Sequence, residues 1–490
     1  MRLIIVSNRL PFTIKKLKTK IEFKESSGGL ATGISSYLES LKSSSFIQKE
    51  HLWIGWCGTT IDNNFKSSVK KKALNDYNAL PVFLDETLME KFYTGFCNKT
   101  IWPLFHCFSL YTHYEEESWT SYKQVNELFC DNIVKIIKPN DIIWIQDYHL
   151  MLLPKLIREK IPEAQIGFFL HIPFPPHEIF RLLPKTWRAE ILEGLLGADL
   201  VGFHTNDYTQ NFFKCVLRIL GLEQNLGTIV LNDRIFRADT FPMGIHFNKF
   251  FEAATLPQTI KEKELFAQML KNVKTILSVD RLDYTKGILN RLEGFDLFLE
   301  KNVQWHKKVT FLLMVIPSRI GVDNYQRMKT KIDESVGKIN GRFGAIDWTP
   351  VVYQYKHLPF HTLVALYNMC DVGLITPLRD GMNLVAKEFL AAKTDKTGVL
   401  ILSEMAGAAK ELGEAIIINP NHKEEIASSI KDALEMPLQE QQQRNEIMQK
   451  RIQSYDVIHW AEDFITELND INKIKNNYKA KILSTTEKNI

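Results

Sequence analysis

The sequence predicts an α/β protein with two doubly wound parallel sheets. Short, continuously apolar runs rich in β-branched residues alternate with helical patterns, as expected for parallel strands that are covered on both faces. The alternation restarts in the second half of the chain, which indicates two such domains. A length of 490 residues with 45% hydrophobic residues is enough to fill a core in each.

The predicted strands form two series. The first covers Leu3–Val6, Ile142–Ile145, Ile166–Leu170 and Leu200–Phe203. The second covers Thr275–Val279, Thr310–Val315, Val372–Ile375, Val399–Leu402 and Ile416–Ile418. Between the first two strands of the second series, Ile288, Leu292, Phe295 and Leu299 form an apolar stripe at helical spacing.

The domain boundary is predicted after residue 245, in the turn-rich segment Phe-Pro-Met-Gly-Ile-His. The N-terminal domain is then 1–245 and the C-terminal domain 246–455, with a helix over Lys261–Asn272. An amphipathic stripe that includes Trp460 and Phe464 predicts a final helix over 456–472. The Lys- and Asn-rich stretch 473–490 is predicted to be a frayed tail.

Composition argues against several classes of protein. A formal net charge of +4 is too small for a nucleic-acid partner. The most apolar stretches fall far short of the ~20 residues that span a bilayer, and the N-terminus lacks the apolar segment of a signal peptide. The six cysteines include no C-x-x-C pair and fit neither a zinc site nor a disulfide framework. We therefore expect a cytoplasmic protein with reduced thiols.

A glycine-containing loop, Ser26–Gly33, runs into a helical segment. Gly28 and Gly29 would let the backbone approach a ligand closely, and the helix N-terminus would attract an anion. The order of glycines is not the G-x-G-x-x-G of a dinucleotide fold. Taken alone, a plain structural turn is as good an interpretation as a phosphate or sugar contact.

Two segments of the second domain follow predicted strands, where ligands of open α/β sheets gather. In Val279–Gly287, Arg281 and Lys286 could neutralise a diphosphate, although a salt-bridged surface pair is an equally good interpretation of that segment alone. In Pro377–Glu388, a tight turn precedes a helix whose first N–H groups face outward. Glu388 suits a ribose diol, or else a surface ion pair. Together the segments outline a nucleotide-diphosphate pocket.

Polar and aromatic side chains also follow strands of the first domain. Asp147 and His171 each come directly after a strand, although a single histidine in such a place is more often structural than catalytic. Trp56, Tyr93 and Trp102 offer aromatic faces of the kind that pack against sugar rings, or they belong to the core.

Eight ordered motifs carry a family resemblance that extends from the first strand to the last helix. They are Val6–Pro11, Trp53–Trp56, Trp144–Leu150, Gly167–Pro175, Ser278–Gly287, Pro317–Arg319, Ile339–Gly341 and Pro377–Glu388. The sequence resembles the trehalose-6-phosphate synthase family, glycosyltransferase family 20. The resemblance implies the GT-B fold, in which two Rossmann-like domains face each other across a cleft and a C-terminal helix crosses back to the first domain.

The resemblance also implies roles for individual residues. Glucose 6-phosphate, the acceptor, would meet Arg9, Trp56, Tyr93, Trp102, Asp147 and Arg319, with the two arginines facing its phosphate. The donor, UDP-glucose in most members, would meet Gly28, Gly29, Arg281, Lys286, Leu358, Asp380, Met382, Asn383, Leu384, Val385 and Glu388. The implied catalytic residues are His171, Arg281, Lys286 and Asp380. Three positions depart from the family pattern: Gln146 replaces a common histidine, Asp280 a glutamate and Gly321 an aspartate.

The implied reaction transfers glucose with retention and yields α,α-trehalose 6-phosphate and UDP, without a metal or other cofactor. Three alternatives stay open: a sister synthase that uses another acceptor such as glycerol 3-phosphate, a non-catalytic sugar-phosphate sensor, and a nicotinamide oxidoreductase. The sensor would be expected to lack Arg281, Lys286 or Glu388, and the glycine fingerprint expected of the oxidoreductase is missing from this sequence.

We expect no nucleic-acid or membrane partner, a separate trehalose-6-phosphate phosphatase and, as an open possibility, a homo-oligomer. The sequence does not separate UDP from GDP or ADP.

Overall fold

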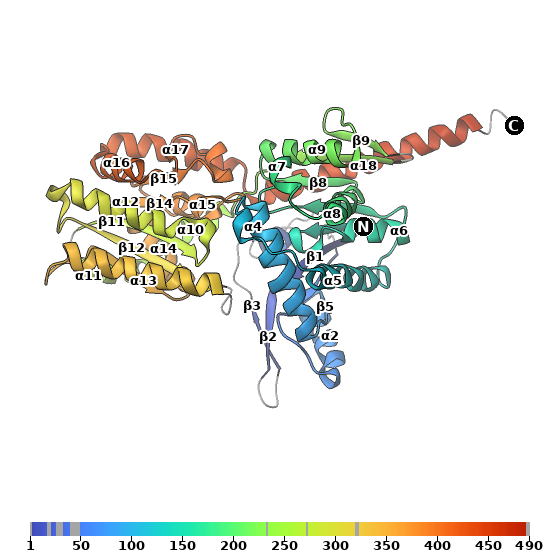
Figure 1. The fold of residues 1–490 in the computed structure, drawn as a ribbon, viewed down its shortest axis with the longest axis horizontal. Helices are drawn as coiled ribbons and strands as arrows, with labels where there is room; N and C mark the ends of the chain where they lie inside the picture. The colour runs from blue at the N-terminus through green and yellow to red at the C-terminus, as the bar shows by residue number, and fades with distance from the viewer. Residues whose placement is uncertain are drawn as a thin grey trace. The chain divides into compact units, whose positions relative to one another are not determined.

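The computed structural model describes residues 2–16, 21–25, 33–39, 50–231, 234–270, 273–318 and 323–486. It divides into two compact units (Figure 1). Unit 1 is Met1–Pro242 with Val457–Ile490, and unit 2 is Met243–Asp456. No helix in these described ranges is both long and apolar enough to cross a membrane.

The chain passes from unit 1 to unit 2 after Pro242 rather than after residue 245. Two contacts within unit 2 fix this point. The carbonyl oxygen of Met243 accepts a hydrogen bond from Lys387 Nζ at 2.8 Å. Gly244 lies so close to Asp456 that a Cβ atom would be 2.4 Å from that residue's carbonyl carbon.

Unit 1 contains an eight-stranded sheet in the order β5-β4-β1-β6-β7-β8-β10-β9. Its strands are β1 (Leu3–Arg9), β4 (His51–Trp56), β5 (Ala79–Val82), β6 (Ile142–Gln146), β7 (Gln165–Phe169), β8 (Leu200–Phe203), β9 (Thr228–Leu231) and β10 (Arg234–Thr240). All neighbours are parallel except β9 and β10. A separate antiparallel pair consists of β2 (Phe12–Lys16) and β3 (Ile21–Glu25).

The helices of unit 1 come mostly between consecutive strands. They include α2 (Asn63–Tyr77), α3 (Glu86–Met89), the π-helix η1 (Glu90–Ile101), α4 (Trp102–Phe105), η2 (Ser109–Tyr111), α5 (Glu116–Val134), η3 (Tyr148–Leu150), α6 (Leu153–Lys160), α7 (His177–Phe180), α8 (Lys185–Leu196), α9 (Asn206–Leu220) and α18 (Val457–Thr486).

The C-terminal helix α18 packs on β7, β8 and β10. Phe464 stacks on Trp144 of β6 with 5.0 Å between ring centroids. Gly167 of β7 permits this close packing, because a Cβ atom there would lie 2.7 Å from the Phe464 ring. The final helix therefore belongs to the same unit as the first strand.

Helix α18 continues through Thr486, so the predicted frayed tail from 473 begins inside a helix. No glycine or proline follows to stop the helix between 473 and 486.

Unit 2 is built on a six-stranded parallel sheet in the order β13-β12-β11-β14-β15-β16. Its strands are β11 (Lys274–Arg281), β12 (Val309–Ile316), β13 (Val351–Tyr355), β14 (Val372–Ile375), β15 (Val399–Ser403) and β16 (Ile416–Ile418). Its helices are α10 (Phe247–Ala253), α11 (Pro257–Leu270), η4 (Tyr284–Lys286), α12 (Ile288–Lys301), η5 (Val303–Trp305), α13 (Asp323–Phe343), α14 (Phe360–Met369), α15 (Leu384–Ala391), η6 (Gly407–Lys410), α16 (Lys423–Glu435) and α17 (Leu438–Ser454).

Each face of the unit 2 sheet has its own hydrophobic core. Ile276 and Phe311 point to the face covered by α12, α13 and α16. Their neighbours Leu277 and Leu312 point to the opposite face, covered by α10, α14, α15 and α17. The sheet is therefore doubly wound, as the continuously apolar strands predicted.

Candidate active site

Two loops at the carboxyl ends of β11 and β14 are joined by backbone hydrogen bonds. The N–H of Leu378 donates to the carbonyl oxygen of Thr285 at 2.8 Å, and the N–H of Arg379 donates to the same oxygen at 3.2 Å. Gly287 adopts a positive φ of 68°, and a Cβ atom there would lie 2.5 Å from the carbonyl oxygen of Thr376. The two segments singled out in the sequence thus form one structure.

The centre of this structure is a hydrogen-bonded group of three polar side chains. Lys286 Nζ donates to Asp380 Oδ2 at 2.6 Å, and Asn383 Nδ2 donates to the same oxygen at 3.0 Å. The Lys286 and Asp380 side chains are only 12% and 14% exposed. One cation and one carboxylate from different loops are therefore held together at the carboxyl ends of the strands.

Asn383 also starts helix α15. Its positive φ of 75° is one that asparagine tolerates, and its side chain accepts a hydrogen bond from the N–H of Ala386 at 3.2 Å. The backbone N–H groups of Leu384 and Val385, the first residues of the helix, have no hydrogen-bond acceptor within the helix. Met382 precedes this turn and is buried, with its carbonyl oxygen bonded to the N–H of Ala408 at 2.7 Å.

Glu388 lies one turn further along α15. Its carboxylate accepts a hydrogen bond from the hydroxyl of Tyr367 at 3.0 Å. Burial raises the pKa of Glu388 from 4.5 to about 7, although the Tyr367 hydroxyl and the charge of Lys249 act in the opposite direction. The side chain is partly exposed, so this carboxyl titrates close to neutral pH while a ligand can reach it.

The other predicted donor residues surround the same end of the sheet. Arg281 ends β11 with an exposed side chain. Leu358 follows β13, is half-buried and packs against the same hydrophobic core as Leu384 and Val385. Strands β13, β11 and β14 therefore present the described donor residues at one edge of the unit 2 sheet.

Arg291 of α12 is a site residue that the sequence analysis missed. It is fully buried and donates to four acceptors: Ser278 Oγ, the carbonyl oxygens of Leu374 and Lys286, and Asp280 Oδ2. Burial raises the pKa of Asp280, and the Arg291 charge opposes that rise. A signal was present, because Arg291 lies three residues after Ile288 and so on the apolar stripe, where a charge is unexpected.

In unit 1, Arg9 and two aromatic residues come together. Arg9 and Trp56 are partners in the register of β1 and β4. The Arg9 guanidinium lies 5.1 Å from the ring centroid of Trp56 and 5.6 Å from that of Tyr93. Trp56 is buried, and its indole N–H has no hydrogen-bond partner among the described residues. The exposed guanidinium of Arg9 and the unpartnered indole N–H of Trp56 thus belong to neighbouring side chains.

A series of ring contacts, one stacked and two tilted, links Tyr93 to Trp102. Tyr93 stacks on His149 with 5.8 Å between centroids, His149 lies 4.0 Å from Tyr148, and Tyr148 lies 5.9 Å from Trp102. Trp102 itself is buried in α4. Trp102 therefore joins this aromatic group through Tyr148.

His171 contacts Gln146, the last residue of β6, and Asp147, which follows it. Its backbone N–H donates to Asp147 Oδ1 at 3.2 Å, and its imidazole Nε2 lies 2.9 Å from Gln146 Oε1. Asp147 has a positive φ of 72°. Burial and the neighbouring His204 lower the pKa of His171 well below its ordinary value. The imidazole is therefore neutral at physiological pH.

Three predicted site residues, Gly28, Gly29 and Arg319, lie outside the described residues, as does the departure Gly321. Among the residues that are described, no group of three or more His, Cys, Asp or Glu side chains is arranged to hold a metal ion.

The family model of glycosyltransferase family 20 matches residues 1–470. The chain belongs to glycosyltransferase family 20.

Several curated relatives resemble this family 20 chain over almost its whole length. The bifunctional trehalose-6-phosphate synthase/phosphatase of Thermoproteus tenax is 48% identical over 469 residues, which are 96% of this chain and 63% of the relative. The UDP-forming α,α-trehalose-phosphate synthase of Schizosaccharomyces pombe is 42% identical over 475 residues, 96% of this chain and 91% of the relative. The chain thus spans less than two thirds of the first of these proteins.

Solved structures with bound ligands have the same fold. The α,α-trehalose-phosphate synthase of Burkholderia xenovorans in complex with glucose-6-phosphate matches with a TM-score of 0.85 and 32% identity, over 96% of this chain and 100% of that one. An E. coli structure bound with UDP-2-fluoro glucose matches with a TM-score of 0.85 and 35% identity, over 96% and 99%. The predicted GT-B fold class is confirmed.

Two of the departures from the family 20 pattern touch the site. Gln146 contacts His171 directly and is itself fully buried, with an amide nitrogen that has no partner in the described structure. Asp280 pairs with Arg291 behind the Lys286 loop. Gln146 therefore supports the predicted catalytic residue His171, and Asp280 supports the loop that carries Lys286.

Proposed function

We propose that this protein transfers a glucosyl group from UDP-glucose to glucose 6-phosphate, forming α,α-trehalose 6-phosphate and UDP. The observation that carries the proposal is the arrangement of Lys286, Asp380 and the start of α15 at the carboxyl ends of β11 and β14. The names of the family relatives and the two ligands bound to the similar structures support the same reaction.

The donor is assigned to unit 2. Breaking the bond between glucose C1 and the diphosphate places negative charge on the leaving oxygen. Arg281, Lys286 and the first N–H groups of α15 are suited to stabilise that charge, because they are fixed before the reaction begins. Glu388 can accept hydrogen bonds from the two ribose hydroxyls, and Leu358 can contact the base through its backbone.

The acceptor is assigned to unit 1. Arg9 offers a guanidinium to the phosphate of glucose 6-phosphate, and guanidinium groups bind phosphate in a bidentate manner. The unpartnered indole N–H of Trp56 can donate to a sugar hydroxyl, while the half-buried ring of Tyr93 can contact the sugar ring. Arg319 is assigned to the same phosphate by the family resemblance alone.

The transfer keeps the anomeric configuration in this proposal. The C1–O bond to the diphosphate breaks on one face of the glucosyl ring, and the anomeric hydroxyl oxygen of the acceptor forms the new bond to C1 on the same face. The proton of that hydroxyl passes to the leaving phosphate oxygen. His171, neutral and held by Gln146 and Asp147, would bind a hydroxyl of the transferred glucose rather than take the proton.

We further propose that the reaction needs no metal ion. Cationic side chains and helix N–H groups supply the positive charge that a divalent cation supplies to diphosphates in other enzymes. In bifunctional relatives a phosphatase accompanies the synthase, and we propose that a phosphatase activity consumes the phosphorylated disaccharide made here.

The test is a coupled assay of nucleotide release with purified protein. UDP-, GDP- and ADP-glucose are each offered with glucose 6-phosphate, glycerol 3-phosphate or no acceptor. We expect the highest kcat/KM for UDP-glucose with glucose 6-phosphate and a product that contains two glucose units and one phosphate. A preference for glycerol 3-phosphate would identify a sister synthase, and binding of sugar phosphates without turnover would identify a sensor.

A further inference from the structure

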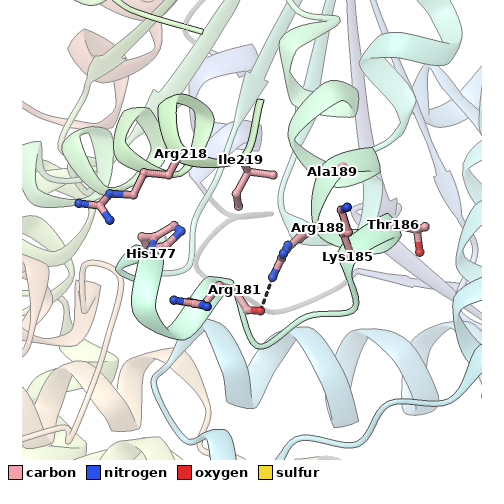
Figure 2. A pocket seen from close by; sticks show the side chains of 8 residues that line it. All are labelled: His177, Arg181, Lys185, Thr186, Arg188, Ala189, Arg218 and Ile219. Atoms are coloured by element: carbon pink, nitrogen blue, oxygen red, sulfur yellow. Dashed lines mark hydrogen bonds between the residues drawn. The ribbon is translucent and has the colours of Figure 1, made fainter. Parts of the chain in front are cut away.

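A cavity of about 740 Å³ lies in unit 1 between α7, α8 and α9. We call it the α7–α9 cavity. It is lined by His177, Arg181, Lys185, Thr186, Arg188, Ala189, Arg218 and Ile219 (Figure 2). None of these residues has been assigned to either substrate above.

The lining of the α7–α9 cavity is strongly basic. It holds four permanent cations, Arg181, Lys185, Arg188 and Arg218, and no carboxylate. The whole chain has a formal net charge of only +4. The four cations of this cavity therefore equal the excess of positive over negative charges in the whole chain. Gathering like charges raises the electrostatic energy of the folded protein unless a counter-charge is bound.

The protein does not supply that counter-charge from the described residues. None of the four cations forms an ion pair with a described carboxylate. The carboxylates nearest in sequence to these cations contact other side chains. Glu190 lies 3.9 Å from Lys123 Nζ, and Glu178 lies 3.6 Å from Lys214 Nζ and 3.9 Å from Nδ1 of the lining residue His177. Elsewhere in unit 1, surface lysines such as Lys155 and Lys160 pair with carboxylates at 2.7 and 2.6 Å.

Two groups of side chains are seen in the cavity. In Figure 2, His177, Arg181 and Arg218 lie on one side and Lys185 and Arg188 on the other. Arg188 Nη1 donates to the carbonyl oxygen of Arg181 at 2.6 Å, which fixes the guanidinium next to the loop between α7 and α8. Burial and the charge of Arg218 lower the pKa of His177.

We propose that the α7–α9 cavity binds a small anion that carries two or more phosphate groups. Each group of cations would take one phosphate, because guanidinium and ammonium groups bind phosphate oxygens through charge-assisted hydrogen bonds. A single phosphate would satisfy only one group. A phosphorylated metabolite and a short inorganic polyphosphate share this chemistry. The site is separate from the residues assigned to the substrates, so the proposal does not depend on glucosyl transfer.

The experiment is a calorimetric titration of the full chain with orthophosphate, inorganic tripolyphosphate and fructose 1,6-bisphosphate. To weaken the phosphate sites assigned to the two substrates, the titrations are repeated in an Arg9→Gln/Arg281→Gln/Lys286→Gln background. We expect tripolyphosphate or the bisphosphate to bind more tightly than orthophosphate in both proteins. Tighter binding of the bisphosphate than of tripolyphosphate would indicate a metabolite, and the reverse order a polyphosphate. The absence of binding in the background variant would overturn the proposal.

Matched variants assign the binding to the cavity. Arg181→Gln/Arg218→Gln removes two lining cations and should weaken binding roughly 10-fold, given about 2–5-fold for each exposed charge pair. Lys214→Gln removes one positive charge, on the same helix as Arg218 but outside the cavity. It should change binding less than about twofold, whereas Arg218→Gln alone, which removes the same charge from the lining, should weaken binding about threefold. Equal weakening by both variants would overturn the proposal in favour of a diffuse positive field. If the double variant unfolds at a lower temperature than wild type, Lys185→Gln alone, with an expected loss of about threefold, decides the question.

Discussion

Glu388 provides a test of the donor site through pH. Burial raises its pKa to about 7, and in the proposed function it must be ionised to accept hydrogen bonds from both ribose hydroxyls. With that pKa, about nine tenths of the carboxyl groups are ionised at pH 8 and about one tenth at pH 6. If only the carboxylate form binds well, the affinity for UDP-glucose falls roughly 10-fold between pH 8 and pH 6.

The raised pKa of Glu388 also predicts how the free energy of unfolding changes with pH. The folded-state pKa of Glu388 lies above the ordinary value of 4.5, so the folded state holds the proton more tightly than the unfolded state. The stabilisation from the neutral carboxyl is therefore complete below pH 4.5 and is lost as pH rises through about 7. At about 1.4 kcal/mol per pKa unit the loss is at most about 3 kcal/mol, and partial exposure of the side chain reduces it to about 1–2 kcal/mol.

Two variants separate Glu388 from other titrating groups. Glu388→Gln should bind UDP-glucose more weakly, with little change between pH 6 and pH 8, and should unfold at a higher temperature than wild type at pH 8. Tyr367→Phe removes the hydroxyl that donates to the carboxylate, so it should move the pH dependence of binding to higher pH.

Calorimetric titration with UDP-glucose suits the measurement, because its diphosphate stays fully ionised throughout this pH range. Thermal unfolding of the same proteins at pH 6 and pH 8 gives the stability comparison. A wild-type affinity that is flat between pH 6 and pH 8, or a Glu388→Gln variant with the wild-type pH dependence, would refute the role assigned to this carboxyl.

Four further outcomes are expected. Arg281→Ala and Lys286→Ala should each lower kcat roughly 10²–10³-fold in the nucleotide-release assay, and near wild-type turnover in both would place the diphosphate elsewhere. Arg291→Met leaves a buried carboxylate unpaired and should lower the free energy of unfolding by about 3–5 kcal/mol in denaturant titrations, whereas a loss below about 1 kcal/mol would contradict the buried network. Gln146→Leu removes the acceptor that fixes His171 and should lower kcat more than it lowers thermal stability; the opposite pattern would make Gln146 structural. Turnover should persist in excess chelator, and complete, metal-reversible loss would contradict the proposed electrostatics.

The sequence predicted strands that form apolar runs, including the edge strand β16, and missed strands of mixed composition, including the interior strands β4 and β10. Strand β12 is buried on both faces and reads as an uninterrupted apolar run, so the sequence identifies it. Strand β13 at the sheet edge is mostly half-buried and mixes tyrosines with a glutamine, so it gives no such run. Strand β10 alternates between half-buried and buried residues and mixes charged with apolar side chains. An apolar run indicates a strand that is buried on both faces, and strands of mixed composition give no such run.

The donor side of the site was predictable for a related reason. In a parallel sheet the carboxyl ends of all strands meet at one edge, so polar residues that follow strands, such as Lys286 and Asp380, can be expected to converge. What the sequence did not provide was the partner of each side chain. The ion pair between these two residues and the four acceptors of Arg291 depend on the exact course of two loops, which no local pattern specifies.

The ion pair between Lys286 and Asp380 bears on how the donor would bind. Both side chains are largely buried, and an unpaired charge there would cost several kcal/mol. In the free protein Asp380 compensates the ammonium group. In the proposed function, a bound diphosphate would offer Lys286 a stronger partner. The Asp380 carboxylate, still held by Asn383 at 3.0 Å, would then be free to accept hydrogen bonds from the hydroxyls of the transferred sugar. Binding of the diphosphate and recognition of the sugar are coupled in this scheme, because the same carboxylate cannot serve Lys286 and the sugar fully at once. A nucleotide diphosphate without a sugar would leave Asp380 with neither partner, which favours the complete donor over its product.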